Sequence, residues 1–460
     1  MHEYPMIAPA IRHRPLWIAL IFLALFTRFY NLASDSLWLD EAFSLRTAMM
    51  PFDRMFHRAL NDPHPPLYPL LLYGWVQLFG SSESAGRSLS AIANLLTLPL
   101  LLALAQRLFN RRVAVMAGLL FLFSPYQIYF AQEVRSYSLL GLLSLASVYT
   151  FLRLLERSDV RRAIAYLLST VLLIYLHVYG WLVLLLENLW VLYRHRRGEL
   201  PFSPAFWAGI QGLLLVLFLP YLGQFLHIVG KVQAHYWLPR PTLLHLAGTL
   251  VQFSGSIALA LICGGLLVWL GFLLYRRREI WRQYRESLIL LLGWGGGVVL
   301  VPFLLSQVLT PFYLPRYVIS ATVPFYLLVA LSIAHLPRKR WSLVTLAVVL
   351  LLSGVPLTRY YREPTREPWR EMVADLRQIA APDEMILLPG FTDTPNWQDA
   401  GAVMLVDPHC ALPDAFLYYA GDLPNPLAGF PREYMEHEFL RNQLFLWLRR
   451  MDRPMWFVSS

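Results

Sequence analysis

Apolar segments long enough to cross a membrane recur along most of the 460-residue chain. A transmembrane helix needs about 20 consecutive apolar residues. Hydrophobic residues make up 57% of the sequence and charged residues 15%, whereas soluble domains carry roughly 25% charged residues. We therefore expect an α-helical polytopic membrane protein with about eleven spans. They are predicted near residues 15–33, 88–106, 113–131, 136–153, 163–179, 180–193, 204–222, 243–275, 287–306, 317–336 and 341–357.

The distribution of basic residues predicts the orientation of these spans. Connections on the side of the N-terminus hold 20 Lys and Arg residues, and those on the opposite side hold 8. Because cytoplasmic loops are enriched in basic residues, we place the N-terminus in the cytoplasm of a multi-pass plasma (inner) membrane protein. Segment 67–79 is too short to span and is interpreted as an interfacial or re-entrant helix, since counting it would invert every later loop. The net charge of +10 then reflects contact with the bilayer, and no nucleic-acid partner is expected.

The composition changes after the last span and predicts a second domain. Charged residues crowd the region just after residue 357, and WREMVADLRQIA (369–380) has helical periodicity. MILLPG (385–390) and PMWFVSS (454–460) are typical of short buried strands, and residues 433–451 of an amphipathic helix. We predict a transmembrane domain at residues 1–357 and a small α/β domain at residues 358–460 on the outer face.

An acidic stretch, residues 34–87, forms the first predicted external loop. A solvated acidic connector is the simplest alternative, but Trp38, Phe43 and Phe52 make the loop too apolar for one and favour short interfacial helices. Adjacent carboxylates beside a bilayer are costly unless they bind a proton or a cation. Asp40 and Glu41 are therefore the candidate catalytic residues.

Other polar residues stand at the outer ends of the spans. Arg135 and Arg316 are candidates for binding a phosphate, because a guanidinium binds phosphate in a bidentate manner; interfacial anchoring is the alternative. Tyr317 follows Arg316 and is assigned to the same phosphate site. Possible contacts to substrate or to a divalent metal are His64, His235 and Trp237, for which a hydrogen-bonded interface residue or an aromatic belt is the alternative. The chain has no glycine-rich phosphate loop, so any sugar donor is expected to be lipid-borne.

Seven motifs lie along the chain in a fixed order, namely LWLDEAFS, HPPLYPLLLYGWVQLFG, AGRSLSAIANLLTLPLLLALAQRLF, YFAQEVRSYSLLGLL, YLHVYG, YWLPRPT and LPRYVISATVPFYLLVAL. Their order and spacing together resemble the bacterial family 39 glycosyltransferases of the GT-C superfamily, whose relatives include the protein O-mannosyltransferases and the lipid A aminoarabinose transferase. The resemblance implies a GT-C fold and an enzyme that transfers a sugar from a polyprenyl-phosphate donor at the outer face of the membrane. By position it implies that Asp40 with Glu41 is the catalytic centre and that Arg316 binds the donor phosphate.

On this basis we expect a hexosyl- or pentosyltransferase that uses a polyprenyl-phosphate sugar and an envelope acceptor, which is a lipid, a glycan or a protein. Asp40 is expected to act as general base or as ligand of a cation. One alternative is a transporter or flippase of lipid-linked saccharides, which would carry charges through its spans. The other is a non-catalytic scaffold of an envelope complex.

Overall fold

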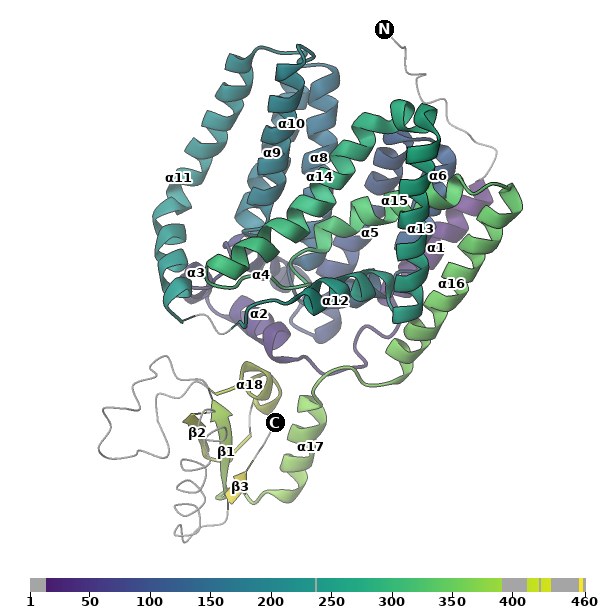
Figure 1. The fold of residues 1–460 in the computed structure, drawn as a ribbon. Coiled ribbons are helices and arrows are strands. Elements are labelled where there is room, and N and C mark those ends of the chain that lie inside the picture. The colour runs from purple at the N-terminus through teal and green to yellow at the C-terminus, as the bar shows by residue number, and fades with distance from the viewer. Residues whose placement is uncertain (1–13, 236–237, 391–411, 422, 432–454, 458–460) are drawn as a thin grey trace. The chain divides into compact units, whose positions relative to one another are not determined.

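A computed structural model describes residues 14–235, 238–390, 412–421, 423–431 and 455–457 (Figure 1). By compactness the chain divides into two units. The first, here called the helical unit, comprises Met1–Leu32 and Pro51–Glu363, and the second, here called the mixed unit, comprises Ala33–Met50 and Pro364–Ser460. The predicted division at residue 357 stays a prediction, and the segment around Asp40 is part of the same compact unit as the C-terminal residues.

The helical unit consists of helices in nearly continuous succession (Figure 1). Its α-helices are α1 (Arg14–Phe29), α3 (Phe52–Leu60), α4 (Leu67–Phe79), α5 (Glu83–Leu108), α6 (Arg111–Leu122), α7 (Pro125–Ala131), α8 (Tyr137–Glu156), α9 (Val160–Leu176), α10 (Gly180–Arg196), α11 (Pro204–His235), α12 (Leu243–Ser254), α13 (Ile257–Arg276), α14 (Arg278–Val308), α15 (Thr322–Ala334) and α16 (Lys339–Arg362), with a 3₁₀ helix, η2 (Ile319–Ala321), before α15.

Six helices among the described residues are long and apolar enough to cross a membrane, namely α5, α8, α11, α13, α14 and α16. The pair α6 and α7 is bent by 59° and makes a seventh if it is counted as one span. Helices α1, α4, α12 and α15 are apolar but shorter. The polytopic helical fold is confirmed, whereas the number of about eleven spans stays a prediction.

The breaks between helices lie at residues with specific local roles. Segment 243–275, predicted as one span, contains two helices separated at Gly255, whose φ of +96° is open to glycine but strained for other residues. A Cβ at Gly255 would meet Pro125 Cγ at 2.7 Å. Segment 113–131 breaks at Ser124, whose hydroxyl accepts a hydrogen bond from the Gln127 amide and caps α7. Each of these two segments therefore contains two helices, and their crossing of the membrane as single spans stays a prediction.

A buried polar network joins three helices of this unit. Glu187 on α10 accepts hydrogen bonds of 2.8 Å from the Ser147 hydroxyl on α8 and from the Tyr166 hydroxyl on α9. Thr170 on α9 lies 2.9 Å from the same Ser147 oxygen. Polar groups removed from water must bond to each other, so this network fixes the packing of α8, α9 and α10.

The mixed unit contains α2 (Leu39–Met49), α17 (Trp369–Ile379), β1 (Met385–Gly390), α18 (Asp414–Ala420), β2 (Leu427–Pro431) and β3 (Met455–Phe457). Its strands form a parallel sheet in the order β2-β1-β3, with Ile386 opposite Leu427 on one side and Trp456 on the other. Central strands of parallel sheets are buried on both faces, and Ile386, Leu387 and Leu388 are fully buried. The predicted helix at 433–451 lies outside the described residues.

Candidate active site

Helix α2 positions the two adjacent carboxylates. It begins after Trp38, whose backbone is extended, so Asp40 and Glu41 fall in the first helical turn. Carboxylates are favoured there because unpaired backbone N–H groups give this helix end a partial positive charge. Successive helical residues are rotated by about 100°. Asp40 therefore lies on the half-exposed face with Phe43 and Arg46, whereas Glu41 lies on the buried face.

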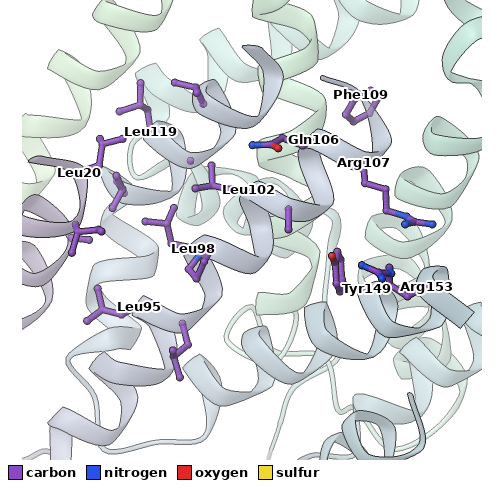
Figure 2. Close-up of a pocket in the computed structure, with 18 of the residues that line it drawn as sticks. Leu20, Leu95, Leu98, Leu102, Gln106, Arg107, Phe109, Leu119, Tyr149 and Arg153 are labelled. Atoms are coloured by element: carbon purple, nitrogen blue, oxygen red, sulfur yellow. The ribbon is translucent and has the colours of Figure 1, made fainter. Parts of the chain in front are cut away.

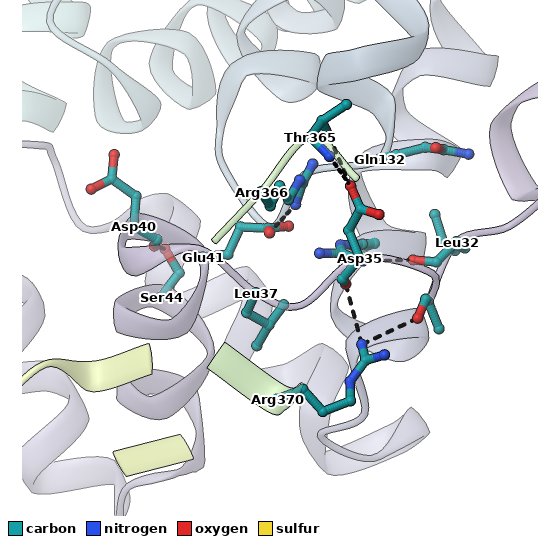
Figure 3. A network of polar contacts seen from close by, with 12 residues as sticks. Leu32, Asp35, Leu37, Asp40, Glu41, Ser44, Gln132, Thr365, Arg366 and Arg370 are labelled. Carbon is teal, nitrogen blue, oxygen red and sulfur yellow. Dashed lines mark hydrogen bonds and ion pairs between the residues drawn. The ribbon is translucent and has the colours of Figure 1, made fainter. Parts of the chain in front are cut away.

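Glu41 forms an ion pair with Arg366 inside the mixed unit (Figure 3). The Glu41 side chain is fully buried, and the Arg366 side chain is 3% exposed. Burial lowers the pKa of Arg366 to about 10, while the charge of Asp35 opposes that shift. Arg366 therefore stays protonated at neutral pH and neutralises Glu41. Asp40 points away from this pair (Figure 3).

Further hydrogen bonds hold the segment before α2 against the residues around α17. The Asp35 carboxylate accepts bonds from the Thr365 amide and hydroxyl, at 3.0 and 2.8 Å. The Ser36 hydroxyl donates to Glu371 at 2.8 Å, and Arg370 donates to the Asp35 carbonyl at 3.2 Å. Two parts of the chain more than 300 residues apart in sequence thus fix the start of α2.

In the helical unit, the structure brings Arg135 and Arg316 to the same aromatic ring. Their guanidinium carbons lie 5.9 and 6.0 Å from the centre of the Tyr137 ring, and that of Arg316 lies 5.7 Å from the Tyr317 ring. A cation within about 6 Å of a ring face is attracted to it. The three residues predicted to bind the donor phosphate therefore lie together in this unit.

The loop after α14 is held by hydrogen bonds that fix the backbone around Arg316. The Ser306 hydroxyl accepts bonds from the Phe312 and Tyr313 amides, at 3.0 and 3.2 Å. The Tyr179 hydroxyl donates to the Phe312 carbonyl at 3.0 Å, and the Tyr126 hydroxyl to the Pro315 carbonyl at 2.7 Å. A positioned guanidinium loses less conformational entropy on binding a ligand than a mobile one.

His64 lies in the same part of the helical unit. Its backbone amide and its Nδ1 lie 2.8 and 3.1 Å from Asp62 Oδ1. Burial would raise the pKa of Asp62, but the hydrogen bond and charge of His64, together with the charge of Arg135, hold that pKa below its ordinary value. The His64 ring lies 5.0 Å from the His177 ring and 5.5 Å from the Tyr317 ring, between centroids.

Sequence reasoning missed Asp62, Tyr137 and His177 as members of this cluster. Within the part of the chain that the structure describes, the Tyr137 hydroxyl and His177 Nε2 are buried without a hydrogen-bond partner. Such atoms call for an explanation, and a bound ligand is one. The available signal was the His-Val-Tyr-Gly break between two short apolar segments, which sets His177 at the end of α9.

The structure does not test the predicted contacts of His235 and Trp237, and among the described residues it shows no cluster of metal ligands. His235 is the last residue of α11, but its side chain and all of Trp237 lie outside the described residues. Three His, Cys, Asp or Glu side chains do not come together anywhere among the residues described. A divalent metal therefore stays a prediction, and we derive no step through one.

One family model matches part of this chain, and several solved structures share its fold. The family model described as dolichyl-phosphate-mannose-protein mannosyltransferase matches residues 63–223. ArnT from Cupriavidus metallidurans in the apo state is 14% identical, with a TM-score of 0.61 over 91% of this chain and 86% of that one. ArnT bound to undecaprenyl phosphate gives 12% identity and a TM-score of 0.60 over 96% and 90% of the two chains. The apo oligosaccharyltransferase from Archaeoglobus fulgidus gives 11% identity and a TM-score of 0.51 over 92% and 65%. No curated protein sequence matches.

These matches confirm the resemblance drawn from the sequence motifs. The fold is that of the GT-C membrane glycosyltransferases, and the chain is a multi-pass membrane protein. The matched segment 63–223 includes His64, Arg135 and His177, which the structure places in one cluster. The family model and the shared fold together support a membrane glycosyltransferase.

Proposed function

We propose that this protein transfers a sugar from a polyprenyl-phosphate donor to an envelope acceptor, namely a lipid, a glycan or a protein, at the outer face of the plasma membrane. The observation that carries the proposal is the shared position of Arg135 and Arg316, whose guanidinium carbons both lie about 6 Å from the Tyr137 ring. Two positive charges at one buried ring suit a phosphate. The similarity in fold to ArnT bound to undecaprenyl phosphate supports a lipid-linked donor.

Arg135 and Arg316 would act on the polyprenyl phosphate, which is the leaving group of the reaction. As the bond between the sugar C1 and the phosphate oxygen breaks, negative charge grows on the phosphate. Arg135 and Arg316 would stabilise that charge, and the Tyr137 hydroxyl is a further donor near them. The free polyprenyl phosphate then leaves with the bonding electrons. His64 and Tyr317, whose rings lie 5.5 Å apart, would form one wall of this site.

Asp40 would act on the acceptor. An acceptor hydroxyl attacks the sugar C1, and its proton passes to the Asp40 carboxylate as the new C–O bond forms. Asp40 suits this role because its side chain is half-buried and points away from the Glu41–Arg366 ion pair (Figure 3). Holding a cation is the other role open to this carboxylate.

Glu41 would position Asp40 without touching the acceptor. The Glu41 carboxylate is fully buried and paired with Arg366, so it is not placed to exchange protons with solvent or substrate. The pair holds the first turn of α2 against the mixed unit and neutralises a negative charge next to Asp40.

The test is incubation of the purified full-length protein with polyprenyl-phosphate hexoses and pentoses and with envelope lipids as acceptors. We expect release of the free lipid phosphate and a glycosylated product. Asp40→Asn should bind donor normally and turn over at least about a hundredfold more slowly, because losing a general base costs about 10² to 10⁴ in rate. Asp53→Asn is the matched control, since Asp53 is an exposed carboxylate of α3.

Two results would overturn the proposal. One is near-normal turnover by Asp40→Asn, which would remove the catalytic assignment. The other is movement of the intact donor across a vesicle bilayer with no release of lipid phosphate by the wild-type protein, which would favour a transporter.

A further inference from the structure

A large groove in the helical unit is lined almost entirely by apolar side chains at one end and by basic side chains at the other. Its volume is about 1740 Å³, and its lining comes from α1, α5, α6, α8 and the start of α9. Figure 2 shows Leu95, Leu98 and Leu102 along the apolar part and Arg107 and Arg153 at the basic end. The volume exceeds the roughly 300–1,000 Å³ of pockets for drug-sized ligands.

The basic end carries three arginines around one glutamate. Arg107 forms an ion pair with Glu156, the Arg153 Nε lies 3.3 Å from the same carboxylate, and Arg162 lies 3.8 Å from it. Arg162 also lies 3.5 Å from Asp159, so these three arginines and two carboxylates carry a formal charge of +1. These residues lie at the end of the bundle that the arginine distribution assigns to the cytoplasm.

The three arginines have different local roles. Arg107 donates to the Leu152 carbonyl at 3.0 Å, and Arg162 to the Arg153 carbonyl at 2.9 Å. Both add a second bond to a carbonyl near the C-terminal end of α8, where the Arg153 carbonyl also accepts from the Arg157 amide at 3.4 Å. Arg153 makes no such bond among the described residues, and its Nε is buried 3.3 Å from the Glu156 carboxylate. Its side chain as a whole is 43% exposed, against 22% for Arg107 and 23% for Arg162, so Arg153 is the arginine of this group best placed to meet a ligand.

We propose that this groove binds an anionic diacyl phospholipid of the cytoplasmic leaflet, with the headgroup phosphate on Arg153 and the acyl chains along the leucines of α5. Charge complementarity selects the occupant, because a group of net positive charge attracts an anionic headgroup and gains little from a zwitterionic one. Basic pockets between transmembrane helices on the cytoplasmic side bind anionic headgroups in this way. The apolar walls match the lipid chains and give a soluble anion no contact beyond the basic end.

The test measures binding of phosphatidylglycerol and phosphatidylcholine to the purified full-length protein by native mass spectrometry. We expect the wild type to prefer phosphatidylglycerol. Arg153→Gln should weaken that binding roughly fivefold, the equivalent of about 1 kcal/mol for one arginine near the membrane surface, and leave phosphatidylcholine binding unchanged. Arg161→Gln is the matched control, because Arg161 is exposed and does not line the groove.

A second variant tests the apolar part. Ala103→Leu adds bulk to the groove wall on α5 and should weaken binding of both lipids without changing charge. Equal losses of phosphatidylglycerol binding in Arg153→Gln and Arg161→Gln would show a general surface effect and overturn the proposal. Binding of polyprenyl phosphate in preference to phosphatidylglycerol would also overturn it, because the groove would then belong to the donor lipid.

Discussion

The buried ion pair between Glu41 and Arg366 allows the two neighbouring carboxylates of α2 to be separated experimentally. Glu41→Gln keeps the shape of the side chain and its ability to accept a hydrogen bond, but it removes the negative charge. Arg366 then remains buried, with 3% of its side chain exposed. The charge of Asp35 still acts on Arg366. The substitution therefore leaves a partly compensated buried cation in the mixed unit.

The expected cost follows from that burial. Removing one partner of a buried ion pair costs about 3–5 kcal/mol. The glutamine carbonyl still accepts a hydrogen bond and Asp35 supplies part of the lost charge, so we expect the lower end, about 3 kcal/mol. That free energy raises the equilibrium constant for local opening roughly a hundredfold, since about 1.4 kcal/mol is a factor of ten. Glu41→Leu combined with Arg366→Met removes both charges and should recover most of the loss.

Hydrogen exchange of the full-length protein measures this opening in place. Backbone amides of α2 (Leu39–Met49) and α17 (Trp369–Ile379) should exchange roughly a hundredfold faster in Glu41→Gln. They should exchange at the wild-type rate in Asp40→Asn, whose turnover falls instead. The reasoning is refuted if Glu41→Gln leaves exchange unchanged and abolishes turnover, or if the double variant is as unstable as Glu41→Gln.

Three further outcomes are expected. Arg316→Ala should weaken binding of a polyprenyl phosphate, and Arg316→Lys should restore it only partly because lysine lacks the planar fork; unchanged binding in Arg316→Ala would contradict the phosphate role. The ionised Asp62 carboxylate, whose folded-state pKa lies below the ordinary 3.8, should stabilise the fold above pH 3.8 and cease to do so as pH falls through its lowered pKa; thermal unfolding of Asp62→Asn should lack this component. In a background without native cysteines, Ser34→Cys, at an exposed site, should react with an impermeant thiol reagent from outside intact cells, and Arg196→Cys should not; the reverse pattern would invert the topology.

Most of the helical unit follows from apolar length and periodicity. The 13-residue apolar segment predicted to be too short for a span is α4, with the expected bounds of Leu67 and Phe79. The break between α9 and α10 was predicted, whereas the breaks at Ser124 and Gly255 were not. The break at Gly255 depends on a contact made only in the fold, namely the approach of Gly255 to Pro125, residues far apart in sequence.

The sequence allowed the charged residues of the candidate site to be identified. It did not show which of these residues pair with each other. Its carboxylates and arginines were found because ionisable groups beside apolar spans are costly. Arg366 was visible only as one of several charges after residue 357, and nothing in its spacing pairs it with Glu41, 325 positions earlier. Long-range pairing of this kind is decided by tertiary packing, which no local pattern records.

Successive side chains on a helix diverge by about 100°, so Asp40 and Glu41 face different surroundings. On the buried face of α2, the negative charge of Glu41 is neutralised by the ion pair with Arg366. The face shared by Asp40, Phe43 and Arg46 is half-exposed, which leaves Asp40 able to meet an acceptor. A carboxylate that anchors its helix through an ion pair is a poor proton acceptor, since the pair favours the ionised form and occupies its oxygens. The geometry therefore favours Asp40 for the chemistry and Glu41 for holding Asp40 in place.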